Sequence, residues 1–205
     1  MPIPLTETVY QEEDFGDVDL SGQSLEEISF IDCDFTDASL AGVRTRRVSF
    51  ERCRMAGTEL YGSTHQSSSF LSCTFDRAAW HGASLTGCRL TGSTFTDCRL
   101  VPLTIRDCDL TLVSLAGAKL AGTDLSGLRM REANLVGANL TNCDLRRADL
   151  RGARCGRLDL SGADLRGASC DAGLWVGAKL AGAVVDVEQA VRFAVSHGLV
   201  LQPEG

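Results

Sequence analysis

The stretch ANLVGANLTNCDLRRADLRGA, residues 133–153, places a leucine at every fifth position: 135, 140, 145 and 150. A period of five matches neither an α-helix, which repeats near 3.6 residues, nor a β-strand, which repeats at two. The pattern therefore indicates an internal repeat, and its unit has to be defined before any local element is assigned.

The period extends over most of the chain without a change of phase. Between Phe15 and Leu180 there are 34 positions spaced by five, and all are apolar except Thr45 and His65, although only 44% of the chain is hydrophobic. We call these positions unit centres and predict that they form the core. Representative core centres are Phe75, Phe95, Leu115 and Leu135.

The other positions of the five-residue unit are restricted as well. The residue two before a centre is usually small or a cysteine, and the residue just before it is commonly Asp, Asn, Ser or Thr. Of the 21 glycines, 16 lie two residues after a centre. Because short polar side chains bond to nearby backbone and glycine accepts turn conformations, each unit is predicted to be one side of a coil that turns at its end.

These units resemble the pentapeptide-repeat proteins, whose A-(D/N)-L-x-x consensus is matched closely by AGAKLAGTDLSG and SGADLRGA. The resemblance implies an all-β fold, a right-handed quadrilateral β-helix with four units per coil and about 8 coils. Phenylalanine centres support this period, since they fall on only two of the four faces. We expect a lead over residues 1–9, the β-helix over 10–183, and a short C-terminal α-helix with a tail over 184–205.

The segment DVEQAVRFAVSHG near the C-terminus predicts that helix, with Asp186 as N-cap, Gln189 completing a capping box and Gly198 as the stop. One interpretation is that the helix only covers the open edge of the last coil. Its apolar stripe and the apolar tail exceed what a cap needs, so we expect a homodimer through this end. The predicted dimer interface consists of Val187, Ala190, Val191, Phe193, Ala194, Val195, Leu199 and Leu201.

Within the pentapeptide class the chain looks most like MfpA-type proteins, relatives of the Qnr proteins, through CRLVPLTIRDCDLTL, ADLRGASCDAGLW and the helical ending. Because its phase is unbroken, the chain resembles the MfpA-like branch more than the Qnr branch, whose members often carry loops that interrupt the coil. The resemblance implies a homodimeric DNA mimic that binds DNA gyrase, inhibits its supercoiling by competing with DNA, and protects it from fluoroquinolones, as an antibiotic-resistance protein. The alternative is a pentapeptide scaffold that binds a different protein partner.

Net charge limits the form that DNA mimicry can take. Duplex DNA carries about one negative charge per 1.7 Å, so a rod of ~41 Å would need roughly 24 charges to match it. The whole chain has a net charge of −7, which excludes mimicry by uniform charge density. Shape combined with local acidic patches is the form that remains.

The acidic residues are concentrated at the start of the chain. Residues 1–43 hold eleven acids and no Lys or Arg, whereas 44–205 hold sixteen acids against twenty bases. We call these first two coils the acidic tip, and expect it to reach a basic DNA-contacting surface on gyrase. The alternative is a solvated terminus that only discourages end-to-end stacking. The predicted partner-binding residues are Asp14, Asp17, Asp19, Glu26, Glu27, Asp34 and Asp37.

Enzyme chemistry finds no support in the sequence. Phosphate-cradling, H-E-x-x-H and G-x-S-x-G motifs are absent, and the histidines His65, His81 and His197 are scattered. All nine cysteines lie at inward positions, where a free thiol acts as a small hydrophobe, so we expect no metal and no cofactor. Without a signal peptide or a long apolar run, the protein is expected to be cytoplasmic and not membrane-bound.

Three local features depart from the repeat or suggest another role. The basic stretch DLRRADLRGARCGRL alternates arginine with aspartate and lacks aromatics, which indicates a mixed solvated face and no direct nucleic-acid binding. Thr45 and His65 lie on one face in adjacent coils and predict a bulge or a polar lining. Pro102, with Leu103 at a normally small position, predicts a bend or swelling of the coil.

Overall fold

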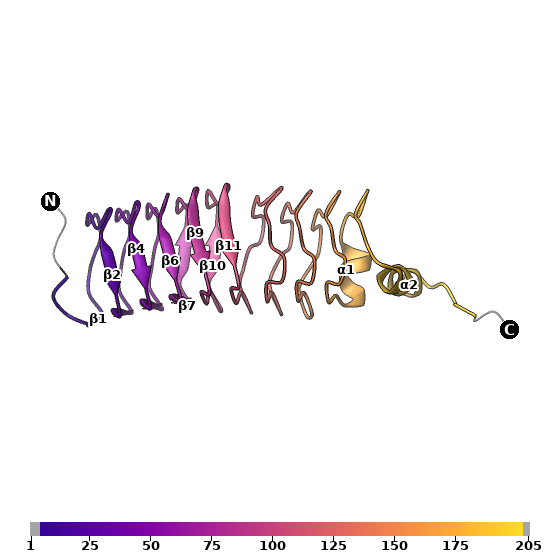
Figure 1. Cartoon of the computed structure of the whole chain (residues 1–205), viewed down its shortest axis with the longest axis horizontal. Coiled ribbons are helices and arrows are strands. Elements are labelled where there is room, and N and C mark those ends of the chain that lie inside the picture. Colours follow the sequence, from indigo (N-terminus) through magenta and orange to yellow (C-terminus); the bar gives the residue numbers. More distant parts are fainter. Residues whose placement is uncertain (1–4, 203–205) are drawn as a thin grey trace.

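The computed structural model describes residues 5–202, which form one long rod with two helices at its C-terminal end (Figure 1). Residues 1–4 of the expected lead and 203–205 of the expected tail lie outside the described part. The rod begins with the acidic tip and ends with the helices, so these two features lie at opposite ends of the molecule (Figure 1).

Short parallel strands form the first half of the rod. They are β1 (Val9–Gln11), β2 (Ser24–Glu26), β3 (Ser29–Ile31), β4 (Arg44–Arg46), β5 (Ser49–Glu51), β6 (Thr64–Gln66), β7 (Ser69–Leu71), β8 (Thr74–Asp76), β9 (Ala83–Thr86), β10 (Thr94–Thr96) and β11 (Leu103–Arg106). The sheet orders are β1-β3-β5-β7, β2-β4-β6-β9-β11 and β8-β10. Paired residues are 20 apart in sequence, as Phe30 and Phe50 are, so each coil holds four pentapeptides.

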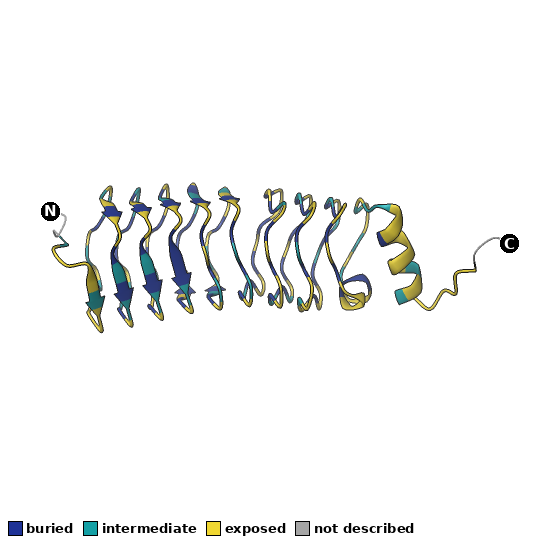
Figure 2. Cartoon of the chain, turned by 60° about the horizontal axis from the view of Figure 1, so that its bottom comes forward, coloured by how far each residue is buried: buried dark blue, intermediate teal, exposed yellow. Residues whose placement is uncertain are grey.

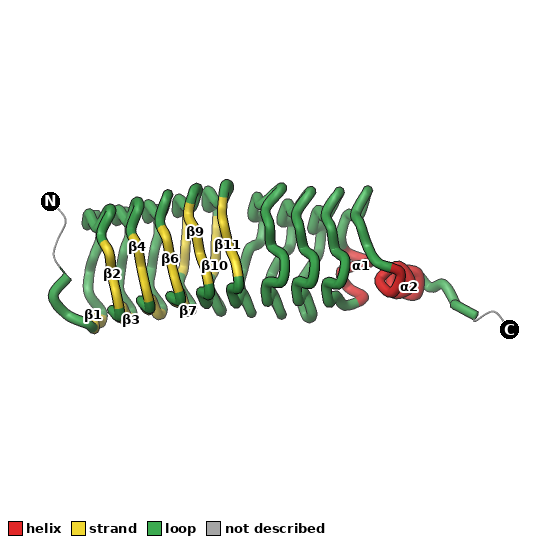
Figure 3. Tube along the Cα trace, in the orientation of Figure 1, coloured by secondary structure: helices red, strands yellow, loops and turns green. Residues whose placement is uncertain are grey.

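Beyond β11 the same pairing continues without extended strands (Figure 3). Single parallel bridges join residues 20 apart, from Asp109 with Arg129 to Asp164 with Val184. Pairing therefore runs from Val9 to Val184, which corresponds to eight complete coils. The β-helix expected from the repeat is confirmed.

The interior of the rod is built from the unit centres, which are buried from Phe15 to Trp175 (Figure 2). Identical positions of successive coils stack on each other, so phenylalanines form ladders. The rings of Phe30 and Phe50 stack with centroids 5.0 Å apart, and those of Phe75 and Phe95 at 4.7 Å. The two phenylalanine faces expected from the sequence are thus present, and each turn of chain adds a layer to one continuous core.

The turns explain the polar and glycine positions of the unit. The residue two after a centre has a positive φ, for example 69° at Gly137 and 56° at Asp17, which favours glycine, asparagine and aspartate. The polar residue before the centre closes the turn: the Asp144 Oδ1 accepts a hydrogen bond from the backbone N–H of Arg146 at 3.0 Å. Both roles agree with the expected turning unit.

Thr45 and His65 lie in regular register between β4 and β6, so the predicted bulge is wrong and the predicted polar lining is right. Thr45 Oγ1 lies 2.8 Å from His65 Nδ1 and 2.9 Å from Ser68 Oγ, while His65 Nε2 lies 2.9 Å from Ser63 Oγ. All four side chains are buried. This closed network satisfies the polar atoms that replace two apolar centres.

The cysteines are free, and most of them are buried in the core. Their thiols donate to backbone carbonyls, as Cys143 Sγ does to Leu120 O at 3.0 Å. Burial raises the pKa of Cys98 to about 11, although this residue is only half-buried by surface area. Within residues 5–202, no group of three His, Cys, Asp or Glu side chains is arranged to hold a metal ion.

Two helices complete the C-terminal end. Helix α2 (Val187–Ser196) has the expected capping box, in which Asp186 Oδ1 accepts from Gln189 N at 2.9 Å and Gln189 Oε1 accepts from Asp186 N at 3.0 Å. Helix α1 (Ala172–Gly177) was not expected, because its centre Trp175 keeps the five-residue phase. Helix α1 replaces one side of the final coil and buries Leu174 and Trp175.

Candidate functional site

The acidic tip is built from the first two coils, and its carboxylates divide into two groups. Arginines of the next coil ion-pair with Glu26, Glu27, Asp32 and Asp34, all one coil (20 or 21 residues) away in sequence. Arg47 contacts both Glu26 at 2.9 Å and Glu27 at 2.6 Å. The stacking of coils therefore places positive charge beside Glu26, Glu27 and Asp34 of the predicted partner-binding set.

Ion pairing and hydrogen bonding shift the ionisation of these carboxylates. A hydrogen bond from Arg46 lowers the pKa of Glu26, and one from Arg52 lowers the pKa of Asp32. Burial acts to raise the pKa of Asp34, but hydrogen bonds from Thr36 and the nearby Arg54 lower it overall. These groups are ionised at neutral pH, with much of their charge offset by arginine.

The second group of tip carboxylates has no arginine beside it. Among the described residues, Asp14, Asp17, Asp19 and Asp37 take part in no ion pair. Asp14 Oδ1 accepts from Gly16 N at 2.8 Å, and Asp19 Oδ1 accepts from Ser21 N at 2.9 Å. The hydrogen bonds from Ser21 lower the pKa of Asp19. These four residues carry the uncompensated negative charge of the predicted set.

At the other end, α2 contacts the rod through a polar side chain. Gln189 is 4% exposed, and its Nε2 donates to the carbonyls of Leu165 at 2.6 Å and Ala168 at 2.9 Å. The capping glutamine thus also covers open carbonyls of the last coils. Sequence reasoning identified its role in the helix cap, and no signal in the repeat pointed to this second role.

Much of the apolar stripe of α2 is exposed in the single chain. Val187 is 82% exposed and Val195 55%, while Val191, Phe193, Leu199 and Leu201 are also exposed. Of the predicted interface residues, Ala190 is exposed and Ala194 is half-buried. Val176 of α1 and Val184 add to the same exposed apolar end. Helix α2 thus contacts the end of the rod through Gln189, while much of its apolar stripe is exposed in the single chain.

The arginine-rich face is compensated in part by neighbouring aspartates. Arg146 Nη2 lies 2.5 Å from Asp144 Oδ2, and Arg151 Nη2 lies 2.6 Å from Asp149 Oδ2. Burial is low and the pairs are solvent-screened, so they contribute little to stability. They reduce the free positive charge that Arg146 and Arg151 could offer to a phosphate backbone.

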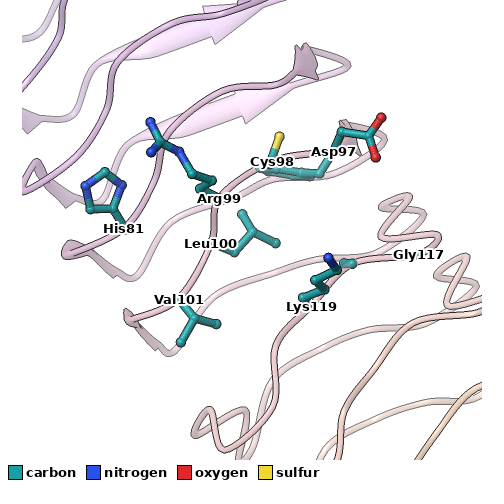
Figure 4. Close-up of a pocket in the computed structure, with 10 residues that line it drawn as sticks. His81, Asp97, Cys98, Arg99, Leu100, Val101, Gly117 and Lys119 are labelled. Carbon is teal, nitrogen blue, oxygen red and sulfur yellow. The ribbon is translucent and has the colours of Figure 1, made fainter.

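A third surface lies at mid-rod, where the coils separate. A cleft of about 530 Å³ opens there, lined by His81, Asp97, Arg99, Val101 and Lys119 among others (Figure 4). The Val101–Pro102 peptide bond beside it is cis. Where the sequence predicted a bend or swelling at Pro102 and Leu103, the structure has an opening between coils.

Family comparison agrees with the repeat geometry. The family described as pentapeptide repeats matches in eight copies, over residues 14–51, 33–64, 68–101, 108–147 and 143–171. The chain belongs to the pentapeptide-repeat family. No curated protein sequence matches it significantly. None of the helices between residues 5 and 202 is long and apolar enough to cross a bilayer.

Solved structures of this family share the fold. Full-length QnrB1, a plasmid-mediated fluoroquinolone resistance protein, superposes with a TM-score of 0.78 at 18% identity, covering 93% of this pentapeptide-repeat chain and 100% of QnrB1. Two trypsin-treated QnrB1 variants give TM-scores of 0.75 and 0.72, each at 19% identity, covering 95% of this chain and 97% of theirs. At these identities the likeness establishes the shared β-helix.

Proposed function

We propose that this pentapeptide-repeat protein is a homodimeric DNA mimic that binds DNA gyrase, competes with DNA and protects the enzyme from fluoroquinolones. The observation that carries the proposal is a straight β-helical rod with uncompensated carboxylates at one end and an uncovered apolar helix at the other. A QnrB1-like fold over nearly the whole length supports it. The role is that of a binding protein without catalysis.

Each end of the rod has a separate part in this proposal. Pairing of two α2 stripes would bury Val187, Val191 and Val195 and leave the acidic tips at the two far ends. The tips would then meet basic DNA-contacting surfaces on gyrase through Asp14, Asp17, Asp19 and Asp37, with charge complementarity speeding and orienting the encounter. Glu26, Glu27 and Asp34 are already offset by arginine and would contribute less.

The test is supercoiling by purified gyrase against a titration of the protein at fixed salt, with and without a fluoroquinolone. Half-inhibition at low micromolar protein, or rescue from drug-induced cleavage, is the expected result. No effect at tens of micromolar from folded, dimeric protein would overturn the proposal. It would favour the scaffold alternative, in which the rod binds a different protein.

Matched amide substitutions resolve the role of the tip. The set Asp14→Asn, Asp17→Asn, Asp19→Asn and Asp37→Asn removes the uncompensated charges of the predicted set, and asparagine keeps the turn hydrogen bonds and the left-handed backbone. The control set is Glu26→Gln, Glu27→Gln and Asp34→Asn. We expect the first set to raise the half-inhibiting concentration about tenfold and the control set less than about threefold. Equal effects of the two sets would contradict the division of the tip.

A further inference from the structure

The opening at mid-rod interrupts the hydrogen-bond ladder between two coils. At most unit centres the N–H donates to the carbonyl 19 residues later, as Trp80 does to Arg99 at 2.8 Å and Leu120 does to Asn139 at 2.9 Å. Within residues 5–202, the equivalent bond from Leu100 to Lys119 is missing, and so is the return bond from Lys119 N to Cys98 O. The two facing edges are therefore unpaired.

The interruption is local and spans two adjacent sides of the coil. Bridges on either side remain, Thr94 with Ser114 and Asp109 with Arg129. Among the described residues, Ile105 also lacks the N–H bond to Asp124 O that its position in the repeat would give. An unpaired pair of strand edges in the middle of a solenoid leaves donors and acceptors that a further strand can satisfy.

The sequence around the opening accounts for its position. Pro102 has no N–H with which to bond the next coil. Leu103 occupies the inward position that holds a small residue in most coils, and it is only half-buried. Leu158 occupies the same position, is fully buried, and Lys179 N donates to its carbonyl at 2.8 Å. A large inward residue alone therefore does not open the ladder.

Two cationic side chains without an ion-pair partner among the described residues line the cleft. Arg99 and Lys119 line it, and neither joins an ion pair within the described part of the chain. In adjoining coils, by contrast, Arg129 pairs with Asp109 at 3.1 Å. Asp97 is the one acidic residue of the lining, so the cleft is net positive. Figure 4 shows Lys119 on the next coil, across the open space from Leu100.

The floor and the approach of the cleft are apolar or aromatic. A small inner cavity of about 30 Å³, lined by apolar side chains that include Trp80, Leu100 and Leu103, lies beneath the opening. On the same side of the rod, the rings of Tyr61 and His81 stack with centroids 5.3 Å apart, and Val101 is exposed beyond them. Alternating side chains of an extended strand would meet an apolar interior and a positive rim.

We propose that this opening binds an extended, acidic peptide segment of a partner protein as an added parallel strand. The segment would accept from the N–H groups of Leu100 and Lys119 and donate to the carbonyls of Cys98 and Lys119. Its inward side chain would be apolar, and its outward acidic side chains would meet Arg99 and Lys119. Added strands gain affinity from main-chain bonds and specificity from alternate side chains.

A peptide fits this site better than a small anion does. The two edges present carbonyl acceptors as well as N–H donors, and an anion can satisfy only the donors. A peptide backbone carries N–H donors and carbonyl acceptors in alternation, so it can satisfy both kinds of group. The cleft volume also lies within the range of ligand-binding sites in proteins. The site lies far from both ends of the rod, so the proposal does not depend on gyrase binding.

Hydrogen–deuterium exchange on the full-length protein tests the open edges. We expect faster exchange in segments 97–107 and 119–124 than in the equivalent segments one coil earlier and one coil later. The fluorescein-labelled peptide EVEVE, used as the probe, should slow exchange in the open segments only. Equal protection of all coils in the free protein would overturn the proposal, because the edges would then be paired.

Fluorescence anisotropy with the same probe tests recognition. We expect EVEVE to bind at least about tenfold more tightly than KVKVK or an EVEVE peptide methylated on its backbone nitrogens. Arg99→Glu with Lys119→Glu should weaken binding at least about tenfold. Lys179→Glu, on the same side of the rod but away from the cleft, should leave it unchanged. Pro102→Gly with Leu103→Ala should abolish binding while circular dichroism shows an intact β-helix.

Several outcomes would contradict the proposal. Equal binding of the methylated peptide would exclude a backbone ladder, and binding that survives the Pro102→Gly and Leu103→Ala changes would place the probe elsewhere. If inorganic phosphate at the same concentration as EVEVE displaces the peptide from the protein, the opening is an anion site and not a peptide site. Absence of binding at millimolar EVEVE would overturn the proposal outright.

Discussion

At the scale of single residues, His65 makes the stability of the rod depend on pH. Burial lowers its pKa to about 3, below the value of roughly 6.5 expected in the unfolded chain. Between these values the unfolded chain binds a proton that the folded chain does not. The free energy of unfolding is therefore expected to fall as the pH drops from about 6.5, by about 1.4 kcal/mol per pH unit. Urea unfolding at pH 7, 6 and 5 measures this slope.

Replacement of the histidine isolates its contribution. His65→Gln retains an amide able to bond Thr45 and Ser63 but cannot titrate, so we expect its stability to be nearly flat between pH 7 and 5. The exposed residue His197 provides the control, and His197→Gln should keep the wild-type slope. A slope that persists in His65→Gln would show that other groups cause it.

A buried unit centre tests the register of the coil. Leu135 is fully buried, so Leu135→Arg would place an unpaired charge in the core, at a cost comparable to the about 5 kcal/mol or more that stabilises a domain. We expect Leu135→Arg, and likewise Leu115→Arg, to lose β-type circular dichroism. Ala121→Arg, at an exposed position, is the control and should remain folded.

Residue-level prediction succeeded where the repeat is strict. A unit centre contacts its counterparts 20 residues away, so one phase specifies burial along the whole rod, and Phe75, Phe95, Leu115 and Leu135 are all buried. The pairing of Glu26 with Arg46 and of Asp34 with Arg54 was missed, although the 20-residue spacing contains it. Comparing each residue with the residue 20 positions later in the sequence would have found these pairs.

At the scale of elements, the junction between rod and α2 depends on Gln189. Gln189→Ala would leave the carbonyls of Leu165 and Ala168 without its Nε2 donor and would remove half of the capping box. We expect a loss of about 1–3 kcal/mol in the free energy of unfolding, measured by urea denaturation. Arg192→Ala removes only the exposed ion pair with Glu188 and should cost less than about 1 kcal/mol. Equal losses would contradict the assigned role.

Elements that break the repeat were predicted less completely. The α2 helix carries its own capping signals, which are local and therefore readable. Helix α1 lies in a segment whose centres Cys170, Trp175 and Leu180 keep the phase, so the pattern gave no warning. Pro102 signalled a disturbance, but whether coils bend or separate depends on packing between coils, which the sequence of one coil does not specify.

At the scale of the whole molecule, the exposed stripe predicts self-association. Two copies of the 21.9 kDa chain should sediment as one dimer at micromolar concentration. Val191→Glu with Val195→Glu places charges on the stripe while leaving the buried Gln189 contacts in place, and we expect a monomer of unchanged circular dichroism. Dimerisation that persists in this variant would locate the interface elsewhere.

The rod geometry further predicts that dimerisation and gyrase inhibition are coupled. In a dimer joined at the α2 ends, two acidic tips are held at a fixed separation, so the second tip binds at a high effective concentration. We expect the monomeric Val191→Glu, Val195→Glu protein to need at least about tenfold more protein for half-inhibition of supercoiling. Fusing a parallel coiled coil to its C-terminus should restore association without the stripe, but in a different relative orientation. If the fusion protein regains potency, two linked tips suffice for strong inhibition. If it stays weak, the two rods of the dimer must be collinear. Full potency of the monomeric variant without the fusion would contradict the coupling.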